Sequence, residues 1–213
     1  MQPLDRRDRR RALVLTVAAA AVVLVLAARI HRGGGAPLWL DIQGERVAFG
    51  HVLGVPLVPD RAARLVVSLG DTPVFAALVG AVIVVALSLR DRISAVVALV
   101  ACPLALLAVE VIGKPVIGRR EGVGYGFPSG HSTAIATFVA LVALLAYRRG
   151  RLRGLVVIAP ATLLVPAMGL ALVRVNFHLL SDSVAGALIG GGTVLGLAGL
   201  ASVLIAGRAP TSA

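Results

Sequence analysis

The sequence contains a single cysteine, Cys102, which lies within an apolar stretch. One cysteine cannot build a disulfide framework or a multi-cysteine metal site. Charged residues make up only 15% of the chain and aromatic residues 4%, whereas 58% of the residues are hydrophobic and the mean hydropathy is +0.95. A soluble domain of 213 residues would carry more charge, so the composition indicates a membrane protein that crosses the bilayer several times.

Acidic residues are also few, because 21 Lys and Arg face only 10 Asp and Glu and leave a net charge of +11. In a soluble chain this excess would suggest nucleic-acid binding. Here the basic residues flank apolar stretches, which is typical of residues that set the orientation of a membrane protein. We therefore expect contact with membrane lipids and no nucleic-acid partner, while the sequence leaves the oligomeric state open.

Six apolar stretches approach the length of about 20 residues that a transmembrane helix needs. They cover residues 12–29, 72–89, 93–113, 131–147, 154–173 and 182–206. The segment 30–71 is too mixed to span and contains Trp39, so we expect an external segment with short helices at the interface. The sequence thus predicts an all-α fold, a bundle of six transmembrane helices that forms a single domain over residues 1–213.

The distribution of arginine predicts the orientation of this bundle. The basic tail 1–11 and the connections at 89–92 and 147–154 would all face the cytoplasm if the N-terminus does, because short basic loops stay on that side. Twelve of the 21 basic residues then lie inside. We therefore expect a multi-pass protein of the cell (inner) membrane with both termini cytoplasmic. The connections 114–131 and 174–182 would then lie on the outer face.

The first apolar stretch has a second interpretation, because a basic segment followed by an apolar run can be a cleaved signal peptide. This run is long for a signal peptide, and the sequence IHRGGG after it is a poor cleavage site. A retained first span is the favoured interpretation. The placement of the later loops is the same in both cases.

The two outer loops hold side chains that can carry chemistry. They contain the single lysine of the chain and both histidines that adjoin spans. Each basic residue alone could simply reach toward lipid headgroups. A whole set of such residues on one face is better explained by a functional site, because charged groups at span ends are costly without a role.

The two histidines indicate catalytic roles. His178 and Asp182 are four residues apart, about one helical turn, so the carboxylate could orient the imidazole and stabilise its cation. That pair alone could also cap a helix. Together with His131 in a cationic setting, the arrangement suggests phosphoryl transfer, in which His178 attacks phosphorus and His131 protonates the departing oxygen.

A further set of residues would bind the phosphate. Backbone N–H groups at the start of a helix bind anions, and the planar guanidinium of arginine suits phosphate oxygens. The expected set is Lys114, Arg119, Arg120, Ser129, Gly130 and Arg174. Glu110 falls one turn before Lys114 and either pairs with that lysine, which we favour, or belongs to a separate proton or ion path.

The motif PSGH at 128–131, followed by HxxxD at 178–182 and preceded by a lysine-led basic segment, resembles the type 2 phosphatidic acid phosphatase superfamily. The likeness covers roughly residues 70–195. It implies a metal-independent phosphatase with a phosphohistidine intermediate and no cofactor. On this resemblance, His178 is the nucleophile, Asp182 its orienting partner and His131 the general acid.

Two arginines of the family pattern do not align with this chain. The first motif usually has an arginine seven residues after its lysine, where this chain has Glu121; Arg120 and Arg119 come one and two places earlier. The third motif usually has an arginine six residues before its histidine, where this chain has Leu172, and Arg174 comes two places later. Arg120 lies in a loop and can replace its counterpart more easily than Arg174.

The sequence therefore predicts an enzyme that removes phosphate from a lipid phosphate at the outer leaflet. Candidate substrates are a polyprenyl diphosphate, phosphatidate and phosphatidylglycerophosphate, and the sequence does not choose among them. A phosphotransferase would use the same site with an acceptor other than water. A lipid-binding or transport protein that kept the fold and lost the chemistry is the alternative from another class. The displaced arginines favour that alternative, and the intact histidines oppose it.

Overall fold

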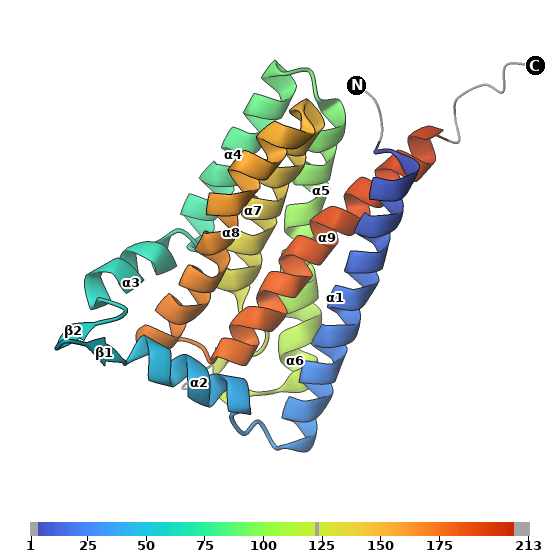
Figure 1. Cartoon of the computed structure of the whole chain (residues 1–213). Coiled ribbons are helices and arrows are strands. Elements are labelled where there is room, and N and C mark those ends of the chain that lie inside the picture. Colours follow the sequence, from blue (N-terminus) through green and yellow to red (C-terminus); the bar gives the residue numbers. More distant parts are fainter. Residues whose placement is uncertain (1–3, 122–123, 207–213) are drawn as a thin grey trace, which may run out of the picture.

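The computed structural model describes residues 4–121 and 124–206 of the chain. Residues 1–3 of the basic tail, residues 122–123 of the first loop and residues 207–213, which include Arg208 among the basic residues counted as cytoplasmic, lie outside this part. Long helices lie side by side in one bundle (Figure 1): α1 (Arg6–Arg32), α4 (Thr72–Ser88), α5 (Arg92–Leu107), α7 (Gly130–Arg149), α8 (Arg151–Arg174) and α9 (Leu180–Ala206). The predicted all-α fold is confirmed.

Among the residues that the structure describes, four helical segments are long and apolar enough to cross a membrane: α1, α5 with its continuation to Ile117, α7 and α9. The short helix α3 (Asp60–Ser68) and α4 would make a fifth span, although the two are bent by 58° relative to each other. Residues 161–174 of α8 form a shorter apolar helix. The bundle of membrane helices is therefore confirmed, whereas the number of six stays a prediction.

Both the start of α1 and the end of α9 lie at one end of the bundle, together with the α4–α5 and α7–α8 turns (Figure 1). At the opposite end, α2 (Trp39–Ala48) lies across the bundle. The strand pair β1 (His51–Val52) and β2 (Val55–Pro56) connects α2 to α3. The short helices expected in segment 30–71 are thus present as α2 and α3.

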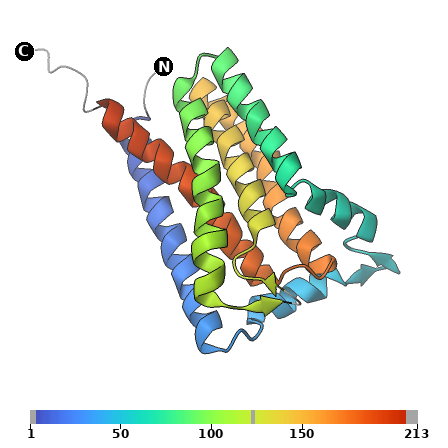
Figure 2. The same cartoon turned by 180° about the vertical axis from the view of Figure 1, so that it is seen from behind.

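The segment after α5 brings the chain to the same end as α2 (Figure 2). Here α5 continues into a π-helical stretch, η1 (Ala108–Gly113), and the single turn α6 (Lys114–Ile117). The antiparallel strands β3 (Arg120–Glu121) and β4 (Gly124–Tyr125) then lead toward α7. Short π-helical stretches frequently occur at functional sites, and this one carries Glu110.

Glycines let α9 pack tightly against α7. A Cβ atom at Gly186 would clash with the carbonyl oxygen of Ser129, and one at Gly190 would clash with the carbonyl oxygen of Thr133. The Thr133 hydroxyl lies in this contact and donates to the carbonyl of Gly186 at 3.0 Å. The beginning of α7 is therefore fixed against the first turns of α9, which carry Asp182.

Candidate active site

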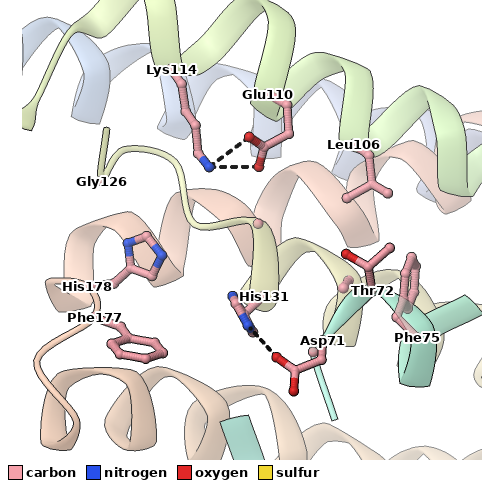
Figure 3. Close-up of a pocket in the computed structure, with 13 residues that line it drawn as sticks. Asp71, Thr72, Phe75, Leu106, Glu110, Lys114, Gly126, His131, Phe177 and His178 are labelled. Carbon is pink, nitrogen blue, oxygen red and sulfur yellow. Dashed lines mark hydrogen bonds and ion pairs between the residues drawn. The ribbon is translucent and has the colours of Figure 1, made fainter. Parts of the chain in front are cut away.

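A cavity of about 470 Å³ lies at the end of the bundle where the two loops 114–131 and 174–182 meet. Its walls come from the α3–α4 turn, η1 and α6, the start of α7, and the α8–α9 connection (Figure 3). The polar side chains that line it are Asp71, Thr72, Glu110, Lys114, His131 and His178. The structure thus brings His131 and His178, which are 47 positions apart in the sequence, to one cavity.

His178 reaches the cavity from the connection before α9, and Asp182 lies behind it in the first turn of that helix. Nδ1 of His178 is 3.9 Å from Oδ2 of Asp182, an ion-pair distance that is longer than a hydrogen bond. The same Oδ2 accepts the backbone N–H of Leu179 at 3.0 Å. The Asp182 side chain is fully buried, so its carboxylate is fixed in place behind the imidazole of His178.

Arg119 holds the other oxygen of Asp182. Its Nη1 donates to Oδ1 of Asp182 at 2.8 Å and to the hydroxyl of Ser181 at 2.8 Å, and its Nη2 donates to Oδ2 of Asp41 at 3.3 Å. Only 1% of the Arg119 side chain is exposed. The structure therefore places this predicted phosphate ligand behind Asp182, and it is not among the described residues that line the cavity.

Asp41 is a residue of this network that the sequence analysis missed. Its Oδ1 accepts the backbone N–H of Ser181 at 2.6 Å, and its Oδ2 accepts the Ser181 hydroxyl at 3.0 Å. Gly44, one turn further along α2, packs so closely against Leu180 that a Cβ atom there would lie 2.8 Å from the Leu180 Cβ. Helix α2 is thereby fixed to the start of α9, next to Asp182.

Lys114 and Glu110 form an ion pair in the cavity wall. Nζ of Lys114 donates to both carboxylate oxygens of Glu110, at 2.7 and 2.8 Å (Figure 3). The pairing favoured from their spacing is therefore present. An incoming phosphate has to share Lys114 with this carboxylate or displace it.

The start of α7 forms another part of the wall. Ser129 caps this helix, since its Oγ accepts the N–H of Ser132 at 3.4 Å, while its own N–H donates to the carbonyl of Asp182 at 3.0 Å. Both the Oγ and the backbone N–H of Ser129 thus already have hydrogen-bond partners within the protein. Gly130 and His131 line the cavity, so the positive end of the helix faces it.

The carboxylate of Asp71, a second residue that the sequence analysis missed, approaches His131. Nε2 of His131 and Oδ1 of Asp71 are 3.2 Å apart (Figure 3). Asp71 follows Gly70 in the turn between α3 and α4. Sixty positions separate the aspartate from the histidine, so no local spacing could have indicated the pair.

The remaining arginines of the predicted set lie elsewhere. Arg174 donates through Nε to Oδ1 of Asp60 at 2.6 Å, and its guanidinium carbon lies 5.0 Å from the centre of the Phe49 ring. It borders a neighbouring cavity of about 500 Å³ that shares Asp71 and Phe177 with the first. Arg120 lies in β3 with an exposed side chain. Within residues 4–121 and 124–206, no three His, Cys, Asp or Glu side chains are grouped to hold a metal ion.

Comparison with known proteins finds one sequence family and one solved structure that are similar to this chain. The sequence model of the PAP2 superfamily matches residues 110–203, which contain Lys114, His131 and His178. The fold is similar to the crystal structure of a transmembrane PAP2-type phosphatidylglycerolphosphate phosphatase from Bacillus subtilis, with a TM-score of 0.68 and 17% sequence identity. That similarity covers 93% of this chain and 98% of the other. No curated protein sequence matches this chain.

Proposed function

We propose that this protein is a lipid phosphate phosphatase, because residues 110–203 match the sequence model of the PAP2 superfamily and the fold is similar to that of a membrane PAP2-type phosphatase. One observation carries the proposal: His131, His178 and Lys114 line the same cavity although they come from three separate elements. A nucleophile, a proton donor and a cation around one cavity are the groups that metal-independent phosphoryl transfer requires.

In the proposed reaction, His178 attacks phosphorus. Its Nδ1 faces Asp182, so we assign the attack to Nε2. The new N–P bond forms as the bond from phosphorus to the lipid oxygen breaks, and that oxygen takes a proton from His131. Water then attacks phosphorus and gives a proton to His131, the N–P bond breaks, and inorganic phosphate leaves with both histidines restored. Asp182 stabilises the positive charge that His178 gains during the first step.

We assign phosphate binding to Lys114 and to the N–H groups at the start of α7. Lys114 lies in the cavity wall, and Gly130 leaves room there, since a Cβ at this position would lie 2.8 Å from Oε1 of Glu110. Glu110 holds the lysine until the anion arrives. The exposed Arg120 and the Arg174 of the neighbouring cavity would contact outer parts of the headgroup.

The proposed substrate is a phosphomonoester or diphosphate of a lipid at the outer leaflet: phosphatidylglycerophosphate, phosphatidate or a polyprenyl diphosphate. The similar Bacillus subtilis protein is described as a phosphatidylglycerolphosphate phosphatase, which makes this lipid the first to test. In this proposal the end of the bundle with α2 faces outward, and the start of α1 and the end of α9 face the cytoplasm.

The experiment is phosphate release from a panel of these lipids by purified protein, with His178→Ala as the control. Activity is expected to survive EDTA, because the proposed chemistry uses no metal, and vanadate should inhibit as a phosphate analogue. Loss of activity with EDTA and its rescue by a divalent cation would contradict the histidine mechanism.

A second candidate is a lipid-binding protein without chemistry. It is favoured by one observation, since Arg119 and Arg174 are both held by carboxylates and neither is among the described residues that line the first cavity. The same panel separates the two candidates. Binding of the lipids without phosphate release, in wild type and His178→Ala alike, would favour the second.

A further inference from the structure

The turn between α3 and α4 reaches into the cavity at the point where His131 lies. A Cβ atom at Gly70 would come within 2.7 Å of Cδ2 of His131 and within 2.9 Å of its Cβ. Any side chain at position 70 would therefore push the turn away from the histidine. The missing side chain allows the close approach that brings Asp71 within 3.2 Å of Nε2.

The chemistry of this contact fixes the roles of both groups. An ionised carboxylate only accepts hydrogen bonds, so Nε2 of His131 donates to Oδ1 of Asp71. The proton that can be transferred then belongs to Nδ1, the other ring nitrogen. In Figure 3 the Asp71 carboxylate and His178 lie on different sides of the His131 ring, so the engaged nitrogen points away from the proposed nucleophile.

The contact contributes little to the stability of the fold. The side chain of Asp71 is 53% exposed and that of His131 is 28% exposed, and ion pairs with this exposure are weak. The carboxylate also does not cap α4, although it occupies the N-cap position of that helix. A structural role therefore does not account for its place in the cavity wall.

We propose that Asp71 is a positioning residue for the proton transfer by His131. It accepts Nε2–H, fixes the orientation of the ring, and so presents Nδ1–H to the lipid oxygen that leaves phosphorus. This inference rests on the proposed phosphatase function. It adds to the site a residue outside 110–203, the segment that matches the superfamily.

The first test compares substrates whose leaving groups differ in their need for a proton. A lipid alkoxide leaves poorly without one, whereas p-nitrophenolate leaves readily as an anion. We expect Asp71→Asn to lower phosphate release from a lipid monophosphate about 10- to 100-fold, and from p-nitrophenyl phosphate by less than about threefold. Gly70→Ala should have the same selective effect. Glu45→Gln, which alters an exposed acidic residue of α2, should change neither rate.

A double variant shows whether Asp71 acts through His131. His131→Asn alone should produce the same selective loss, and adding Asp71→Asn to it should have no further effect. Additive losses in the double variant, or an equal loss on both substrates in Asp71→Asn, would overturn the inference while the phosphatase function stands.

The second test does not depend on activity. The chain has four histidines, so the ¹⁵N signals of His131 can be assigned by difference against His131→Asn. The neutral ring should carry its proton on Nε2 in the wild type and on a mixture of both nitrogens in Asp71→Asn. A wild-type ring protonated on Nδ1 would overturn the inference. A wild type that releases no phosphate from any substrate would overturn the proposed function and this catalytic role together.

Discussion

Replacing Arg119 with methionine should destabilise the protein strongly, although phosphate binding was the role first expected for this residue. Its guanidinium lies between Asp182 and Asp41, whose side chains are fully buried. Removing the cation leaves two buried carboxylates without compensation, which costs about 3–5 kcal/mol. At about 2–4 °C per kcal/mol for proteins of roughly this size, the midpoint of thermal unfolding should fall by about 6–20 °C.

The assay is thermal unfolding of purified protein in detergent, followed by the fraction that stays monodisperse in gel filtration. Arg119→Lys should lose part of this stability, because an ammonium group lacks the planar fork that serves several acceptors at once. The double variant Arg119→Met/Asp41→Asn should recover part of the loss, since one buried charge has been removed.

The neighbouring Arg120 provides the matched control, because its side chain is exposed. Arg120→Met should change the unfolding midpoint little and, if it contacts the headgroup, should lower activity instead. An Arg119→Met protein that unfolds at the wild-type temperature would refute the role of the buried network.

Three other predictions concern the rest of the bundle. Burial raises the pKa of Asp91, but hydrogen bonds from Arg148 and Ser94 outweigh this effect and lower the pKa below its usual value of 3.8. The stability that this carboxylate contributes is therefore present above pH 3.8 and lost as the pH falls below it, so the thermal stability of Asp91→Asn should depend less on pH in this range. Gly190→Ala should lower the free energy of unfolding by about 1–3 kcal/mol, because the new Cβ would clash with α7. Gly191→Ala should be neutral or slightly stabilising in the same unfolding assay, because no atom lies within 4 Å of a Cβ at that position. In a Cys102→Ala background, cysteine at the exposed position Val52 should react with an impermeant thiol reagent from outside the cell and cysteine at Arg92 should not; the reverse labelling would invert the orientation.

The helices were predictable from the sequence because apolar runs and the charges that end them are local features. The run predicted at 131–147 is observed as α7 (Gly130–Arg149), and the run at 182–206 as α9 (Leu180–Ala206). The stretch 93–113 extends further, to Ile117, because η1 and α6 continue α5 beyond the last apolar residues. The Lys114–Glu110 ion pair was predictable for the same reason, since one helical turn separates the two residues.

The partners of the site residues were not predictable, because they depend on how distant segments meet. Asp41 and Asp71 stand in a part of the chain that we interpreted only as an external segment. Arg119 looked like a phosphate ligand because its charge and its loop position fitted that role. Only the packing of α2 against α9 shows that two buried carboxylates accept its hydrogen bonds.

The contacts of Asp41 and Asp71 connect two parts of one chain. Residues 110–203 supply the groups proposed to react. The part before them supplies one carboxylate that contacts His131 and another that accepts hydrogen bonds from Arg119 and Ser181, next to Asp182. A chimaera that exchanged only residues 30–72 between relatives would keep every reacting group and alter the setting in which each one works. Such exchanges offer a way to vary rate and substrate preference in this fold without touching the histidines themselves.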